Sequence, residues 1–188
     1  MLRDETTVLV RAVEPADKNV IRAGFDRLGD ESRYRRFLAP TAELTEPMLR
    51  YLTEVDHHDH EALVALDPDS GEGVGIARFV RTGPRNNAEV AVTVVDDWQG
   101  RGLGTVLLEL LAERAREEAI ETFSALTLTT NTEMINLLRS LGAMRVTERD
   151  GSCIEVETAL PPAGVHPALR ELLRRTADPA SGMGPAKA

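Results

Sequence analysis

Cysteine and metal-binding side chains are scarce in this sequence. Cys153 is its single cysteine, so no internal disulfide can form, and no spacing of cysteine and histidine predicts zinc. We expect Cys153 to act as a small apolar side chain in a strand. His57, His58 and His60 lie close together, but no second group of ligands accompanies them, so no metal is expected. They are predicted to lie in a solvated loop or at the rim of an acceptor site.

Basic residues are outnumbered by acidic ones, 22 to 31, which gives a net charge of -9 at pH 7. Nucleic acids and anionic membranes would repel such a chain, so we expect neither as a partner, whereas a cationic substrate is compatible with it. Long apolar stretches are also missing, because no run approaches the roughly 18 apolar residues of a membrane span. Residues 1–7 lack the apolar core of a signal peptide, so a cytoplasmic location is expected.

What is present suits one globular domain. Of 188 residues, 42% are apolar, which is enough to bury a core. We expect this domain to span residues 1–160. The composition changes in the tail, residues 161–188, whose end is rich in proline, glycine and alanine. For the tail we expect a short helix over 166–176, followed by disorder.

Apolar periodicity and turn residues predict the order of the elements. Short alternating or continuous apolar runs predict strands, and apolar residues at i, i+3 and i+4 predict helices. Helices are expected over 15–28, 30–38, 46–54, 102–119 and 132–141, and strands over 6–13, 61–67, 73–81, 87–95, 123–129, 143–149 and 152–160. The last two strands form a hairpin across Asp150-Gly151, which is a strong turn signal.

The stretch from Val90 to Thr105 organises the rest of the chain. An apolar run ends in two aspartates, Gly100, Gly102 and Gly104 follow at alternate positions, and an amphipathic helix comes next. Glycines let the backbone approach a ligand, and the first amides of a helix point outward with the positive end of its dipole. This arrangement predicts a socket for an anion such as phosphate, or else a plain tight turn between two core elements. Its spacing fits neither the dinucleotide fingerprint nor the P-loop.

The pattern Gln-x-x-Gly-x-Gly, at Gln99, Gly102 and Gly104, resembles the acyl-CoA pyrophosphate loop of the GCN5-related N-acetyltransferases (GNAT). The resemblance extends over roughly residues 6–160. It implies an α/β (α+β) fold with a mixed, mostly antiparallel central sheet of six to seven strands, about four flanking helices and splayed central strands. It also implies acetyl-CoA as co-substrate and no metal. The residues that it assigns to acetyl-CoA are Thr93, Val94, Val95, Gln99, Gly100, Arg101, Gly102, Leu103, Gly104, Thr105 and Asn131.

The resemblance divides these residues among three tasks. Main-chain amides of 99–105 would hold the diphosphate, and free amides of 93–95 would hold the thioester oxygen and the pantetheine arm. Asn131 would contact the coenzyme, although a role as helix N-cap explains it nearly as well. Leu138 stands where many relatives carry a tyrosine that protonates the leaving thiolate, so no side-chain acid is expected. A thiol pKa of about 8.5 makes an unassisted thiolate tolerable as leaving group.

Glu89 is the expected general base. A lysine amine has a pKa near 10.4, so its deprotonation at pH 7 costs roughly 4.6 kcal/mol, which a nearby carboxylate can help to offset. In a strand over 87–95, the valines at 90, 92 and 94 point one way and Glu89 the other. Alternation alone favours a plain solvent-facing acid. The resemblance favours catalysis, because many relatives carry the base in this strand.

Segments 30–37, 55–65 and 88–104 together resemble the catalytic domain of bacterial Pat-type protein lysine acetyltransferases. The implied acceptor is a lysine ε-amine of a protein, and segment 32–37 is either a charged helix face or a contact to acceptor and coenzyme. Two other functions stay open: acetylation of a small-molecule amine or antibiotic, and a catalytically silent module that binds acyl-CoA. We expect a monomer or a homodimer.

Overall fold

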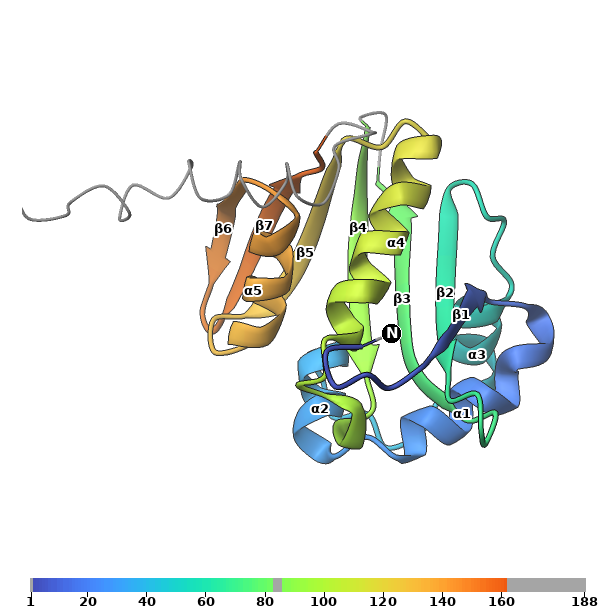
Figure 1. Ribbon diagram of the computed structural model, residues 1–188. Coiled ribbons are helices and arrows are strands. Elements are labelled where there is room, and N and C mark those ends of the chain that lie inside the picture. Colours follow the sequence, from blue (N-terminus) through green and yellow to red (C-terminus); the bar gives the residue numbers. More distant parts are fainter. Residues whose placement is uncertain (1, 83–85, 162–188) are drawn as a thin grey trace, which may run out of the picture.

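The computed structural model describes residues 2–82 and 86–161, which form one seven-stranded sheet (Figure 1). The strand order is β1-β2-β3-β4-β5-β7-β6, and neighbours run antiparallel except for the parallel pair β4 and β5. The strands are β1 (Leu9–Ala12), β2 (His60–Leu66), β3 (Gly73–Arg81), β4 (Asn87–Val94), β5 (Thr122–Leu128), β6 (Met144–Asp150) and β7 (Cys153–Ala159). The expected mixed, mostly antiparallel sheet is confirmed.

Five α-helices flank this sheet within the described residues, one more than the resemblance implies. Helices α4 and α5 cover one face, and the three N-terminal helices cover the other (Figure 1). They are α1 (Lys18–Asp26), α2 (Asp30–Phe37), α3 (Glu46–Thr53), α4 (Leu103–Glu117) and α5 (Thr132–Leu141), with single 3-10 turns at Pro15–Asp17 and Asp96–Trp98.

Two apolar clusters hold these layers together. The larger lies between α4 and the sheet and contains Phe79, Leu107 and Phe123, which are fully buried. The smaller lies between the sheet and helices α1 and α3, around Phe25 and Leu49. Because side chains alternate along a strand, β2 and β3 contribute to both clusters, whereas the apolar residues of β4 belong to the larger cluster alone.

The sheet splits between its two parallel strands. Strands β4 and β5 pair only over Asn87–Glu89 and Thr122–Ser124, although both strands continue well beyond these residues. Figure 1 shows β5 leaning away from β4 along the rest of its length. The unpaired edge of β4 therefore faces an opening, which confirms the splayed central strands.

The N-terminal boundaries differ from those expected. Strand β1 is shorter than 6–13, and the helix expected from Pro15 begins as a 3-10 turn before α1. The reason is Asp17, whose buried carboxylate accepts two hydrogen bonds of 2.7 Å from Arg11 and one of 2.8 Å from the Glu14 amide. These bonds fix a sharp change of direction between strand and helix.

Two further expectations concern the chain as a whole. The tail and its expected helix over 166–176 lie outside the described residues, apart from Pro161. Within the described part, the longest helix is α4 with 15 residues, and none is long and apolar enough to cross a bilayer.

Candidate active site

A cleft of about 650 Å³ occupies the opening between β4 and β5. Its floor is β4, and its walls come from α2 on one side and from α4, α5 and β5 on the other. Most residues assigned to the coenzyme from sequence line it. These are Thr93, Val94, Gln99, Gly100, Gly102, Leu103, Gly104, Thr105 and Asn131, and Glu89 joins them.

The glycine turn forms one end of this cleft. Gly100 and Gly102 have φ angles of 75° and 90°, in the left-handed region that favours glycine. A Cβ on Gly102 would lie 3.2 Å from Cγ of Arg3, so the bare backbone is also needed for space. Gly102 is the N-cap residue of α4, and no side chain caps the helix there. The first amides of α4 are therefore available to an anion. This end of the cleft suits the diphosphate of a coenzyme.

Gln99 ties this turn to its surroundings. Its side-chain amide donates to the Val94 carbonyl at 3.0 Å, to Asp96 at 3.2 Å and to the Ser32 hydroxyl at 3.3 Å. One side chain thus joins the end of β4, the 3-10 turn and α2. The glutamine of the motif holds the shape of the loop, whereas the amides supply the donors.

The expected free amides of 93–95 need a correction. The Val95 amide donates to the Val74 carbonyl of β3 at 3.0 Å, so it is not free. In an antiparallel pair, bonded and non-bonded residues alternate, so Thr93, which faces Ile76, also directs its amide towards β3. The amides of Val92 and Val94 point the other way, towards the opening. Of the three amides that the resemblance assigned, only that of Val94 therefore points into the opening.

Two assigned residues, Val95 and Arg101, do not line the cleft. Val95 is buried and lines a small cavity on the α1 side of the sheet. Arg101 lies over the Trp98 ring at 5.0 Å and faces Asp4 at 3.7 Å. Its carbonyl accepts a hydrogen bond of 3.1 Å from the Arg3 amide, and it is Arg3 that lines the cleft. No sequence signal connects this N-terminal arginine with the loop.

Asn131 is a helix N-cap, as expected, and its contact with the coenzyme stays a prediction. Its side-chain oxygen accepts a hydrogen bond from the Met134 amide at 3.2 Å, so it is the N-cap of α5, and it also lines the cleft. Leu138, on the same helix, is fully buried in the larger apolar cluster and is not part of the cleft wall. No hydroxyl therefore stands at this position.

Glu89 is exposed and lines the cleft, while the next residue, Val90, is buried on the opposite face. Within the described residues, its carboxylate makes no hydrogen bond or ion pair. Across the sheet it lies in one row with Val80 of β3 and His60 of β2, because cross-strand partners share a face. Glu89 is therefore a carboxylate without a hydrogen bond on the floor of the cleft, on the sheet face that α2 and α3 cover, and its charge acts on Arg36.

Further polar residues lie near this carboxylate. The sequence had drawn attention to His60 and to the segment that contains Arg36, but not to Arg78. Arg78 of β3 is buried, and its guanidinium lies 4.2 Å from the Tyr51 ring. His60 lies 5.2 Å from the same ring, and burial together with Arg78 lowers the pKa of His60 to about 4. Burial and Arg78 also lower the pKa of Arg36, on α2, to about 10. At pH 7 the imidazole is neutral and both arginines carry their charge. The sequence signal that could have indicated Arg78 is an arginine inside an otherwise apolar strand.

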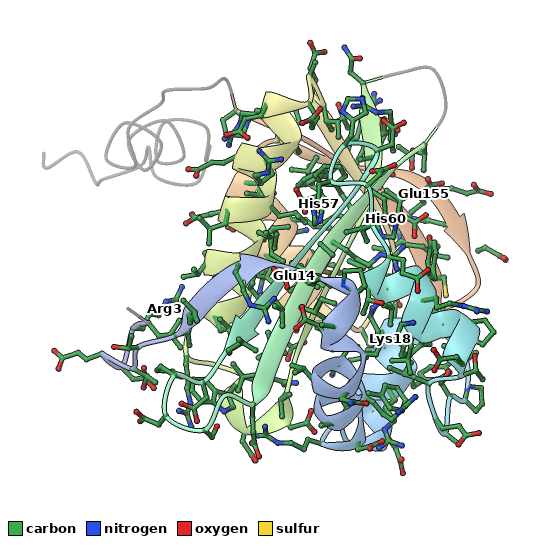
Figure 2. All side chains as sticks on the ribbon, turned by 90° about the vertical axis from the view of Figure 1, so that its right-hand side faces the viewer. Arg3, Glu14, Lys18, His57, His60 and Glu155 are labelled. Atoms are coloured by element: carbon green, nitrogen blue, oxygen red, sulfur yellow. The ribbon has the colours of Figure 1, made fainter. Side chains whose placement is uncertain are left out.

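His57 and His58 contact carboxylates outside the cleft. His57 meets the buried Glu61 at 2.7 Å, Glu61 also binds Arg114 at 3.1 Å, and His58 pairs with Glu118. Figure 2 shows His57 and His60 near each other and far from Arg3. Among the residues that the structure describes, no cluster of three metal-ligating side chains occurs.

A split mixed sheet, with an uncapped helix N-terminus and an exposed carboxylate in one cleft, is the arrangement of an acyltransferase. Residues 30–143 match the model of the acetyltransferase (GNAT) family. The chain belongs to this family of acetyltransferases. Acetyltransferase Pat from Mycolicibacterium smegmatis is 36% identical over 170 residues, which cover 90% of this chain and 50% of Pat. The chain thus spans about half the length of that relative.

Solved structures agree with the fold. The GNAT domain of PAT from S. lividans superposes with a TM-score of 0.78 at 32% identity, over 85% of this chain and 94% of that one. YncA, a putative acetyltransferase from Salmonella typhimurium solved with its cofactor acetyl-CoA, has a TM-score of 0.64 at 22% identity, over 85% and 96% of the two chains. At that identity the second likeness shows the fold alone.

Proposed function

We propose that this protein transfers the acetyl group of acetyl-CoA to a lysine ε-amine of a protein substrate, with Glu89 as general base. The single observation that carries the proposal is the free carboxylate of Glu89 on the floor of the cleft. The similarity to Pat and to the GNAT domain of PAT supports an acyl acceptor of the same kind.

The coenzyme would lie along the unpaired edge of β4. Its diphosphate would accept hydrogen bonds from the first amides of α4, beyond Gly102, and its pantetheine arm would extend along the strand like an additional strand. The Val92 and Val94 amides, which point into the opening, would then stabilise the negative charge that develops on the thioester oxygen. Arg3 would add a positive charge beside the diphosphate.

Transfer would occur by direct attack of the amine. The amine nitrogen forms a bond to the thioester carbonyl carbon, the carbonyl oxygen takes up negative charge, and the carbon–sulfur bond then breaks to release the coenzyme A thiolate. Glu89 accepts the proton that the amine loses, directly or through water. Water is considered because Glu89 is about 10 Å along the strand from Val92, whose amide would hold the thioester oxygen. Because Leu138 offers no proton, the thiolate leaves unassisted or takes a proton from water.

The test is acetylation of protein lysines by the full chain. Candidate proteins incubated with acetyl-CoA are digested and their lysines are examined by mass spectrometry, and labelling should require Glu89. Glu113→Gln, at an exposed acid on α4, serves as the matched control. Coenzyme binding without thiol release from any protein or small amine would overturn catalysis and favour a silent module.

A further inference from the structure

The proposed acceptor side of the cleft holds two arginines, Arg36 and Arg78, and Glu89 is the anionic side chain whose charge acts on Arg36. Arg36 and Arg78 make no hydrogen bond or ion pair within the described residues. Each lies against an aromatic ring, Arg36 at 5.0 Å from Phe37 and Arg78 at 4.2 Å from Tyr51. Arg78 is only 7% exposed. Burying a guanidinium without a hydrogen-bonded anion is costly, so such a pair indicates a partner that the chain itself does not supply.

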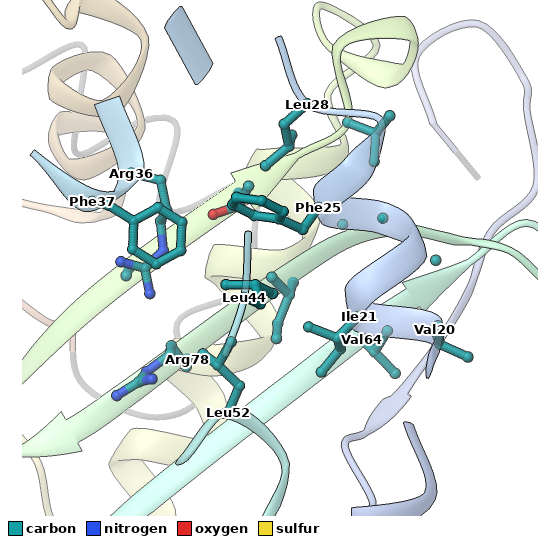
Figure 3. Close-up of a pocket in the computed structure, with 17 residues that line it drawn as sticks. Val20, Ile21, Phe25, Leu28, Arg36, Phe37, Leu44, Leu52, Val64 and Arg78 are labelled. Atoms are coloured by element: carbon teal, nitrogen blue, oxygen red, sulfur yellow. The ribbon is translucent and has the colours of Figure 1, made fainter. Parts of the chain in front are cut away.

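A small cavity connects these two side chains. It measures about 60 Å³, lies between α1 and the sheet, and is lined by Arg36, Arg78 and Thr93 among mostly apolar residues. The Thr93 hydroxyl is buried there without a hydrogen-bond partner. Figure 3 shows both arginines on the side of the cavity away from Val20 and Ile21 of α1. A water needs about 10 to 15 Å³ of such space, so the cavity has room for a group of carboxylate size.

The charges around this cavity favour an anion. The pKa of Arg36 is lowered to about 10 by burial and by Arg78, which still leaves it charged at pH 7. His60 is neutral there, because burial and Arg78 lower its pKa to about 4. Two positive charges thus face the single negative charge of Glu89, in a protein whose net charge is -9. An ammonium group that arrived alone would meet a positive surface.

The same wall places the arginines close to the reacting amine. Arg78 faces Ala91 across the sheet, so Glu89 is its diagonal neighbour on the same face. Diagonal neighbours of this kind have Cα atoms about 7 to 8 Å apart. Arg36 and Thr93 line both the small cavity and the large cleft, so the two spaces meet at these residues.

We infer that Arg36, Arg78 and the Thr93 hydroxyl form a carboxylate-binding subsite, and that the preferred acceptor carries a carboxylate a short distance from its amine. The carboxylate comes from an acidic residue near the acceptor lysine or from the main chain of a free amino acid. The inference rests on the proposed function, because it assigns the substrate class of that same cleft. It adds a selection rule: the acceptor supplies the hydrogen-bonded anion that the two guanidinium groups lack.

The test compares acceptors that differ only in this charge. Lysine peptides with Glu at each position from three before to three after the lysine are paired with their Gln counterparts, and free lysine is paired with lysinamide. Thiol release from acetyl-CoA gives kcat/KM for each member. A charge-assisted hydrogen bond contributes about 10- to 100-fold, so at least one acid should exceed its amide by that factor. The pair that shows the effect identifies the source of the carboxylate.

Variants assign the effect to the arginines. Arg78→Gln and Arg36→Gln should each reduce the acid-to-amide ratio to about 1, and Arg78→Lys should keep part of it. Arg22→Gln, at an exposed arginine of α1 outside the cavity, should leave the ratio unchanged. If Arg78→Gln does not fold, Arg36→Gln and Arg78→Lys still decide. Ratios within twofold for every pair in the unmodified protein would overturn the inference.

A binding readout separates this inference from the proposed function. The melting temperature of the full chain with coenzyme A is measured in the presence of lysine, lysinamide and the best peptide pair. Stabilisation by the acids alone, lost in Arg36→Gln, supports the subsite even if no acceptor releases thiol, in which case only the proposed function fails. Thiol release at equal rates for acids and amides would overturn the subsite and leave the proposed function standing.

Discussion

The two sides of the cleft are built from different parts of the chain. The side proposed for the coenzyme consists mainly of backbone: the glycine turn at 100–104, the first amides of α4 and the outward amides of Val92 and Val94. The side proposed for the acceptor consists of side chains: Glu89 and Arg36 line the cleft, and Arg78 and His60 lie next to them. The difference teaches where substitutions matter. On the first side we expect the backbone geometry to carry the function, and on the second side the individual charges.

The largest effect is expected on the acceptor side. Glu89→Gln keeps the size of the side chain but cannot accept the proton of the amine, so turnover should fall by about 10² to 10⁴. Coenzyme A affinity should stay the same, because the coenzyme side is untouched. Steady-state kinetics and calorimetry measure the two quantities. Unchanged turnover would show that another group accepts the proton of the amine. The two sides of the cleft would then not differ as described.

A substitution in the glycine turn should instead weaken the binding of coenzyme A. Gly102→Ala adds a Cβ at a φ of 90°, 3.2 Å from Cγ of Arg3, and should weaken coenzyme A binding by about 10- to 100-fold through a displaced loop. Gly71→Ala is the matched control, since Gly71 has a φ of 74° and nothing within 4 Å of the added atom. Both variants carry similar backbone strain. Equal affinity in the two would show that the turn does not hold the coenzyme.

The acceptor side should also make stability depend on pH. Burial and Arg78 hold the pKa of His60 at about 4 in the folded protein, against about 6.5 when it is unfolded. Between these values the unfolded chain binds more protons, so stability is highest above pH 6.5 and falls as pH approaches 4. The loss should be about 1 to 2 kcal/mol, after allowance for partial exposure of the ring. Urea unfolding at pH 7 and pH 5 measures it.

His60→Gln should remove most of this slope. The other groups near the ring are Asp56 and Glu61, which raise the pKa of His60, and His57, which lowers it. Asp56 itself has a lowered pKa because backbone amides bond to it, so its own loss of stability comes at lower pH. A slope that persists in the variant would place the titration elsewhere.

The smallest effect is expected at the helix cap on the coenzyme side. Asn131→Ala removes the bond to the Met134 amide and should cost about 1 kcal/mol of stability, whereas Asn131→Ser keeps a capping oxygen and should cost a few tenths. Urea unfolding compares them. A loss of coenzyme affinity shared by both variants would show that the side-chain amide contacts the ligand in addition to its structural role.

The two sides also differ in how much of their structure the sequence predicts. The strand, glycine turn and helix at 90–119 were predictable, because local φ requirements, helix termini and apolar periodicity are written in adjacent residues. The exposed face of Glu89 followed from alternation. The phase of the free amides did not, since it depends on which residue of β3 pairs with Val95. The proximity of Arg36 and Arg78 could not be predicted either, because they come from a helix and a strand that are far apart in sequence.

Calorimetric titration of the intact protein with coenzyme A and with pantetheine tests the central claim most directly, since the two ligands differ in the diphosphate and the nucleotide. The account predicts one coenzyme A site, with pantetheine at least 100-fold weaker, because the charge-assisted bonds at the start of α4 are then missing. Absence of coenzyme A binding by folded protein, or equal affinity for both ligands, would contradict it.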